Sequence, residues 1–263
     1  MSRAASTSRP AQPAHEDRWG SAVAVTAEPD DPLRERVLDA LSRVYDPELD
    51  EPITTLRFVS SLMISADGDV ELLLRLPTPQ CAPNFAFLMA SDARRAVRSV
   101  PGVRTASVVL EDHYTGDEIN AALARGQGFS GAFPGETEDD DLEALRVLFT
   151  RKSFVARQAA VCDDLIAAGA SAEQVVAHRV RDLPDTPGAR RALQLRGQLG
   201  IAGEADDPGF VLADGAPLVA DELERWLRMA RLIRLGLEAN GGICRSLLEF
   251  RHNLGPAPEE VAR

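Results

Sequence analysis

The residues best suited to chemistry lie at the two ends of the segment Tyr45–Asn84. One end, Tyr45–Glu48, reads Tyr-Asp-Pro-Glu and offers two carboxylates on a turn. The other end reads Thr-Pro-Gln-Cys and offers Thr78 and Cys81 just ahead of an expected helix. Residues 56–76 between the ends have the pattern of a two-stranded hairpin, which would bring the two polar ends close together.

Cys81 is the leading candidate for a reactive thiol. It lies one or two residues before a helix expected from Pro83 to Ser99. The free N–H groups and partial positive charge of a helix N-terminus favour a thiolate. A thiolate is the form that ligates iron or zinc, or attacks an electrophile. The alternative is a structural cysteine, which the surrounding turn makes less favourable.

Cys244 is the second candidate thiol. It follows Asn-Gly-Gly at 240–242, which we expect to break the chain and to start a last helix at 243–253. Cys244 would then also lie at a helix N-terminus, and Cys81 and Cys244 could share a metal across a domain interface. The supporting ligands would be polar residues from the first domain: Asp46, Glu48 and His113. The alternative for Cys244 is a thiol packed between domains.

Cys162 has a different setting. It lies on the apolar face of a long helix expected to begin near Leu142 and to end at Gly169, where a cysteine behaves as a small buried hydrophobic residue.

The elements around these residues predict an α+β fold. A helix begins at Asp31-Pro32 and ends before Pro47, and the alternating strand 70–76 follows the strand candidate 56–64 across a turn at 67–68. The helix 83–99 and a strand at 103–110 complete an α-β-β-α-β N-terminal domain, followed by a mostly α-helical C-terminal domain. The expected boundaries are a disordered tail over 1–28, the α+β domain over 29–125, a linker over 126–141 and the helical domain over 142–263. A short helix at 115–124 closes the first domain.

Composition narrows the classes of function. The chain has 263 residues and a net charge of −12, which argues against binding nucleic acid because that needs a basic face. We expect no membrane partner, because no apolar run reaches the length of a membrane span and the N-terminus lacks an apolar signal region. Three widely spaced cysteines fit a reducing compartment, so we expect a cytoplasmic protein.

The motifs resemble a known family. Tyr45–Glu48, the segment Leu-Pro-Thr-Pro-Gln-Cys-Ala-Pro at Leu76–Pro83 and Val-Pro-Gly-Val at Val100–Val103 are similar to the iron–sulfur assembly domain of SufT and PaaD proteins. The same domain occurs in the cytosolic iron–sulfur targeting factor of eukaryotes. Order, spacing and expected elements agree over roughly residues 32–115. Two stretches depart from the family pattern: Thr55–Phe58, and Gln80-Cys81-Ala82 in place of the usual Gly-Cys.

The resemblance implies a non-enzymatic maturation role, in which iron–sulfur clusters or iron are assembled or delivered to a client metalloprotein. It places the acidic motif on Asp46 and Glu48, the threonine on Thr78 and the reactive cysteine on Cys81. It implies transient iron or a transient cluster rather than a stably bound cofactor, and the iron–sulfur assembly machinery as a partner. Because so few thiolates cannot supply the four ligands of a cluster, a homodimer is a further possibility.

The helical half lies outside that resemblance. It is similar to an extension of actinobacterial members that accompany multicomponent di-iron monooxygenases, which implies such an oxygenase system as the client. Two other functions stay open on the residues alone. One is a cysteine-nucleophile enzyme with Cys81 and with His113 as base, and the other is a protein-interaction adaptor that handles no metal.

Overall fold

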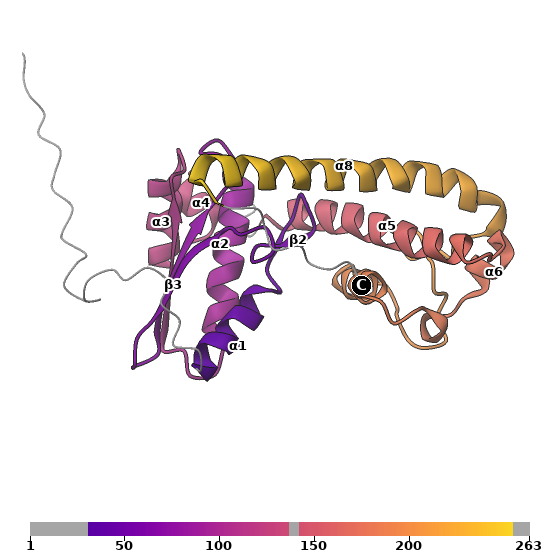
Figure 1. Cartoon of the computed structure of the whole chain (residues 1–263), viewed down its shortest axis with the longest axis horizontal. Coiled ribbons are helices and arrows are strands. Elements are labelled where there is room, and N and C mark those ends of the chain that lie inside the picture. The colour runs from indigo at the N-terminus through magenta and orange to yellow at the C-terminus, as the bar shows by residue number, and fades with distance from the viewer. Residues whose placement is uncertain (1–30, 137–141, 255–263) are drawn as a thin grey trace, which may run out of the picture.

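The computed structural model describes residues 31–136 and 142–254, which form two halves joined along one long helix (Figure 1). The N-terminal half is α+β and the C-terminal half is mostly helical, which confirms the predicted fold class. The predicted tail at 1–28 and most of the acidic run before residue 142 lie outside the described residues.

The first helix, α1 (Pro32–Leu41), begins as predicted. The Asp31 carboxylate caps it by accepting a hydrogen bond of 2.9 Å from the Leu33 N–H. The helix ends earlier than expected, because Tyr45–Asp46 (β1) leaves the helix and pairs with Glu51–Pro52 (β2) in an antiparallel ladder. The acidic motif therefore lies in a tight turn closed by two short strands.

The main sheet has the order β3-β4-β5. Strand β3 (Val59–Ile64) is antiparallel to the central strand β4 (Asp69–Arg75), and β5 (Thr105–Glu111) is parallel to β4 on its other side. Helix α2 (Pro83–Arg98) forms the crossover between β4 and β5 and packs on β5. The turn between β3 and β4 requires Gly68, which has φ of +81° and lies so close to the Gly102 carbonyl that a Cβ would clash.

Strand β3 begins three residues later than predicted. Residues 54–57 instead form a turn, in which the Arg57 N–H donates to the Thr54 carbonyl at 3.1 Å and Arg57 has positive φ. This turn delays the entry of the chain into the sheet.

Two helices follow β5. Helix α3 (Gly116–Arg125) matches the predicted short helix, whereas α4 (Phe129–Ala132) lies inside the segment predicted to be a linker. The Phe129 ring packs edge-on against Phe87 at 5.5 Å and belongs to the N-terminal core. Burial of that aromatic side chain explains why this part of 126–141 is structured.

The helical half contains α5 (Glu143–Ala167), α6 (Ala172–Ala177), the short 3₁₀ turn η2 (Val180–Asp182), α7 (Pro187–Gln198) and α8 (Ala220–His252). The predicted capping box of Ser171 and Gln174 starts α6. Apolar side chains of α5, α7 and α8 form a second core, which includes Cys162 as predicted. None of the described helices has a stretch apolar enough to cross a lipid bilayer.

Helix α8 links the halves. Near its start, Leu223, Leu227 and Ala230 are buried in the helical core, whereas Leu248 near its end is buried in the core of the α+β half. Figure 1 shows the helix running the length of the molecule, over α5 and on to the α+β half. The predicted chain break at 240–242 is wrong, because the helix continues through it.

Candidate functional site

Cys81 lies in the loop between β4 and α2. Helix α2 begins at Pro83 with Ala82 as its N-cap, and no side chain caps it, which confirms the predicted place of Cys81 just ahead of a helix. The Thr78 Oγ1 and Cys81 Sγ atoms lie 3.6 Å apart, and the Cys81 N–H donates to the Thr78 carbonyl at 3.4 Å. The structure thus brings together the threonine and cysteine of the motif.

His113 holds the same loop through its backbone. Its Nε2 lies 2.7 Å from the Cys81 carbonyl oxygen, and its Nδ1 accepts a hydrogen bond of 3.3 Å from the Thr115 N–H. An Nδ1 that accepts leaves the ring proton on Nε2, so these bonds assign a neutral imidazole whose Nε2–H donates to Cys81. The neighbouring Tyr114 N–H donates to the Pro79 carbonyl at 3.1 Å. His113 therefore positions the cysteine loop and directs its ring to the carbonyl of Cys81.

Asp46 builds the acidic turn. Its Oδ1 accepts hydrogen bonds from the N–H groups of Glu48 at 2.8 Å and Leu49 at 3.0 Å. The side chain is only 7% exposed, and burial raises its pKa to about 6. The nearby carboxylates of Glu48 and Glu51 raise it further, whereas the two backbone hydrogen bonds oppose the rise. Asp46 therefore titrates close to neutral pH.

Cys244 lies in the interior of α8, so the predicted helix N-terminus at this residue is wrong. Its pKa is raised to about 11, first by burial and then by electrostatic interaction with Asp46, Cys81 and Glu48, whereas Arg245 lowers it. This environment favours a protonated thiol. Both cysteines pack against the N-terminal core, and Arg245, next to Cys244, forms an ion pair with Glu51 of the acidic turn.

Helix α8 continues through its glycines because the acidic turn packs against it. A Cβ on Gly241 would lie 2.7 Å from the Glu51 Oε1 atom, so any larger residue here would require that carboxylate to move. Glu51 in turn forms an ion pair with Arg245, one turn further along α8. A tertiary contact thus outweighs the poor helix propensity of Gly-Gly.

Arg251, near the end of α8, ties the two site loops together. It donates to the Pro77 carbonyl at 2.8 Å and to the Asp112 carboxylate at 2.6 Å. Pro77 precedes the cysteine loop and Asp112 precedes His113, so one guanidinium bridges both. No signal in the sequence indicated this role, because the contacts span more than a hundred residues.

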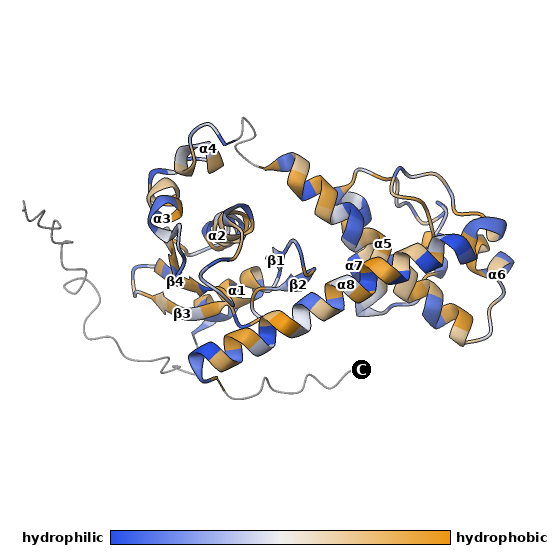
Figure 2. Cartoon of the chain, turned by 90° about the horizontal axis from the view of Figure 1, so that it is seen from above, coloured by the Kyte–Doolittle hydropathy of each residue, from blue (hydrophilic) through white to orange (hydrophobic). Residues whose placement is uncertain are grey.

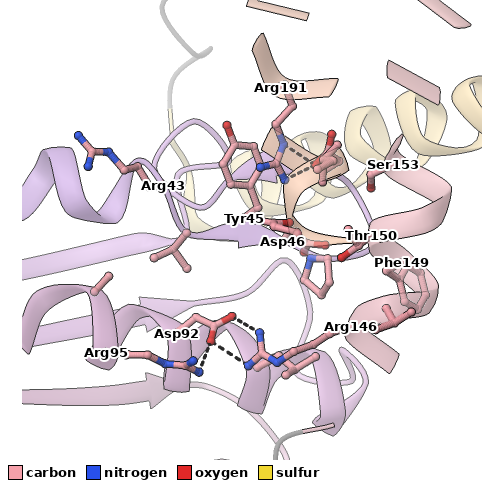
Figure 3. Close-up of a pocket in the computed structure, with 18 of the residues that line it drawn as sticks. Arg43, Tyr45, Asp46, Asp92, Arg95, Arg146, Phe149, Thr150, Ser153 and Arg191 are labelled. Atoms are coloured by element: carbon pink, nitrogen blue, oxygen red, sulfur yellow. Dashed lines mark hydrogen bonds and ion pairs between the residues drawn. The ribbon is translucent and has the colours of Figure 1, made fainter. Parts of the chain in front are cut away.

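A cavity of about 640 Å³ opens between the halves on the side of the acidic turn (Figure 3). Asp46 and Asp92 both line it. Asp92 forms an ion pair with Arg95 of the same helix and another with Arg146 of α5. Cys81 is not among its lining residues. The cavity gives solvent a route to the Asp46 side of the site.

Asp50 is buried beside this cavity, where two arginines of the helical half hold it. Its carboxylate accepts from Arg157 Nε at 2.7 Å and from Arg191 Nε at 3.0 Å, and it is only 2% exposed. The Arg191 guanidinium also stacks on the Tyr45 ring at 3.5 Å. Figure 3 shows Arg191 reaching over Tyr45. Asp50 is therefore a structural residue of the acidic loop, which sequence reasoning had not separated from its neighbours.

The described residues contain no group of three or more His, Cys, Asp or Glu side chains already arranged to hold a metal ion. The site instead presents two free thiols, Cys81 and Cys244, with carboxylates nearby. The third cysteine, Cys162, is fully buried, and burial raises its pKa to about 12, which fits its predicted role in the core.

Comparison with known proteins identifies the first half. The model of the family described as iron-sulfur cluster assembly protein matches residues 34–108. An uncharacterized protein of Methanocaldococcus jannaschii is 32% identical over 90 residues, which make up 34% of this chain and 93% of that protein. The chain belongs to the iron-sulfur cluster assembly protein family. The resemblance to SufT and PaaD proteins is thereby confirmed, and with it a general role in iron–sulfur cluster assembly.

The family match contains part of the site only. Asp46, Glu48, Thr78 and Cys81 lie within residues 34–108, whereas His113 and the whole of α8 lie beyond it. Cys244, Arg245 and Arg251 are therefore additions that this member of the iron-sulfur cluster assembly family makes to the shared domain.

Proposed function

We propose that this protein is a maturation factor that passes iron or an iron–sulfur cluster, as cargo, to a client metalloprotein in the cytoplasm. Cys81 would be the thiolate that binds the cargo. The observation that carries the proposal is the place of Cys81 just ahead of the uncapped start of α2, with the Thr78 hydroxyl oxygen 3.6 Å from its sulfur.

Each residue has a distinct part in the proposed transfer. The Cys81 sulfur bonds to the metal, and the Thr78 hydroxyl, 3.6 Å away, is placed to donate a hydrogen bond to that sulfur. Cys244 supplies a second thiol, which loses its proton when it binds the positively charged cargo. Asp46, with a pKa of about 6, is suited to accept that proton. On release, a client thiolate replaces each protein sulfur, and the freed thiolates are reprotonated.

The small number of thiols supports transient binding. An iron–sulfur cluster normally has four thiolate ligands, and two cysteines leave at least two positions open. Those positions would be filled by ligands of the assembly machinery or of the client, so that cargo is exchanged rather than retained. The protein would then act without catalysing a reaction of its own.

We propose a multicomponent di-iron monooxygenase, or its iron–sulfur reductase, as the client. The support is the resemblance of the helical half to extensions that accompany such systems. The last turns of α8 contact the acidic turn through Arg245 and the start of the cysteine loop through Arg251, so a client bound at that end of the helix would lie close to this loop.

The decisive experiment replaces Cys81 with Ser in the full chain. We expect Cys81→Ser to lower the amount of iron transferred to apo-client at least tenfold under anaerobic conditions. Cys244→Ser should lower binding of ferrous iron by the maturation factor alone. Tyr114→Phe is the control, because its side chain is exposed and its contact with the cysteine loop is made by its backbone N–H.

Full client activity with Cys81→Ser would contradict the proposal. If that variant also still co-purified with the client, the adaptor function would take its place. The cysteine-nucleophile enzyme is less well supported, because His113 is engaged with the Cys81 carbonyl and not with its sulfur.

A further inference from the structure

The outer face of α8 is an exposed apolar stripe. Leu232 is 72% exposed and Phe250 is 88% exposed, although both are large apolar side chains. At about 100° per residue, nine residues fall within a sector about 120° wide on the side away from the cores. We call them the outer stripe: Met229, Leu232, Leu235, Gly236, Ala239, Ile243, Ser246, Leu247 and Phe250.

Charged residues of the same part of α8 turn away from the stripe. Arg231 and Arg234 pair with Asp163 of α5, and Arg245 pairs with Glu51 of the acidic turn. The helix thus directs its charges toward its own chain and its apolar residues toward solvent. A monomer seldom exposes such a stripe, which runs for about 32 Å along the helix.

No other described helix or strand lies over the outer stripe. In Figure 1, α8 lies at the top edge of the molecule, and in Figure 2, which looks down from above, its length is uncovered and apolar residues recur along it. As far as the described residues go, the stripe is therefore open to contact with another chain.

Gly236 gives an independent indication of a partner. A Cβ at this position would meet nothing within 4 Å, so packing within the chain does not explain the glycine. Glycine inside a helix costs about 1 kcal/mol relative to alanine. Gly241 differs, because Glu51 occupies the space beside it. A glycine on an exposed apolar face lets a second helix approach closely.

We propose that the outer stripe binds the outer stripe of a second copy of this chain, with the two α8 helices antiparallel. A two-fold interface needs a surface that is complementary to itself, and the stripe has this property about a point between residues 239 and 240. Positions at equal distances on either side of that point match in three pairs: Met229 with Phe250, Leu232 with Leu247, and Gly236 with Ile243. In the third pair, a bulky side chain of one copy faces a glycine of the other. This inference does not depend on the proposed function.

The dimer would keep the two cargo sites apart. Cys244 of one copy is level with residue 235 of the other, so the two Cys244 residues are about 14 Å apart along the helix axis alone. Each chain would then carry its own site, and the dimer would not complete a cluster by sharing Cys244.

Light scattering of the full chain after size-exclusion chromatography tests the proposal. We expect twice the mass of one chain for the wild type, and half that value for Leu232→Glu and for Ile243→Glu. The control is Leu148→Glu, because Leu148 is an exposed leucine of α5 outside the stripe, and this variant should stay dimeric. Circular dichroism establishes that each variant keeps its helices. A monomeric wild type at micromolar concentration would overturn the proposal.

Oxidative cross-linking tests the direction of the helices. Ala239→Cys should form a disulfide-linked dimer, because residue 239 lies beside the two-fold axis. Met229→Cys should not, because its two copies would be about 32 Å apart. The native cysteines are the same in both variants and act as a shared background. Cross-linking of both variants would mean a parallel pair and would reject the antiparallel interface.

Discussion

Asp46 combines two roles in one side chain. Its Oδ1 atom closes the acidic turn by accepting two backbone N–H groups, and its burial makes the charged form costly. Asp46 therefore holds the backbone of the acidic turn in place, and the pKa of its carboxyl group depends on the charges around it. The charge of the Asp46 carboxylate also acts on Cys244, because it helps to raise the pKa of that thiol.

Asp46→Asn should remove a pH dependence of stability. A pKa raised from 3.8 to about 6 means that the folded state holds a proton that the unfolded state releases between these values. The wild type should therefore lose about 3 kcal/mol as the pH rises from about 4 through 6. The variant keeps the Oδ1 acceptor and lacks the charge, so its stability relative to the wild type should rise over that range. Urea unfolding at pH 4 and pH 8 measures the change, and a constant difference would show that Asp46 does not titrate in this window.

At the scale of elements, α8 depends on contacts that a helix pattern does not contain. Asn240, Gly241 and Gly242 are poor helix formers, yet they lie in the middle of a 33-residue helix. The Glu51–Arg245 ion pair and burial of Leu248 in the first core hold this section against the α+β half. Contacts with the α+β half therefore stabilise this section of α8 in addition to the hydrogen bonds of the helix itself.

The two adjacent glycines give a matched pair of variants. Gly242→Ala should raise stability by up to about 1 kcal/mol, because alanine is the better helix former and a Cβ there meets nothing within 4 Å. Gly241→Ala should be about 1–2 kcal/mol less stable than Gly242→Ala, because its Cβ displaces the Glu51 carboxylate from Arg245. Thermal unfolding of both variants compares them directly. Equal melting temperatures would mean that Glu51 moves aside without cost.

The elements that sequence reasoning located are those with local signals. The Asp31 cap, the turn at Gly68 and the start of α2 at Pro83 each depend on neighbouring residues, so the sequence suffices to place them. The break before Cys244 was wrong because the deciding contact, Glu51 against Gly241, joins residues far apart in the chain.

In the candidate site, too, local contacts were predictable from the sequence and contacts between distant residues were not. The approach of Thr78 and Cys81 is local and was predictable, and their place in the family motif supports it. The contacts of Arg251 with Pro77 and of Asp50 with Arg157 and Arg191 were not, since they join distant segments. The predicted pairing of Cys244 with Cys81 rests on a helix start that does not exist, and Cys244 instead lies within α8 beside Arg245, which pairs with Glu51 of the acidic turn. Whether the two share a metal stays a prediction.

At the scale of the whole molecule, the acidic loop joins the two halves. Asp50 extends from the α+β half to Arg157 of α5 and Arg191 of α7, while Glu51 meets α8 through Arg245. Consecutive carboxylates thus bind three helices of the other half. The acidic loop that belongs to the proposed cargo site therefore also attaches the helical half to the α+β half.

Asp50→Asn tests that anchor. The variant keeps a residue that tolerates the positive φ of 53° at this position, and it removes the charge that balances Arg157 and Arg191. Because the Asp50 carboxylate is 2% exposed, loss of one partner of this buried pair should destabilise the protein by about 3–5 kcal/mol. The matched control is Asp39→Asn, which breaks an exposed ion pair between Asp39 of α1 and Arg43 just beyond its end and should cost less than about 1 kcal/mol. Urea unfolding followed by the fluorescence of Trp226, which packs in the helical core, and by circular dichroism gives both values.

We further expect the two signals to separate in Asp50→Asn, because the halves then unfold less cooperatively. Similar losses for the two variants would show that the Asp50 charge does not couple the halves.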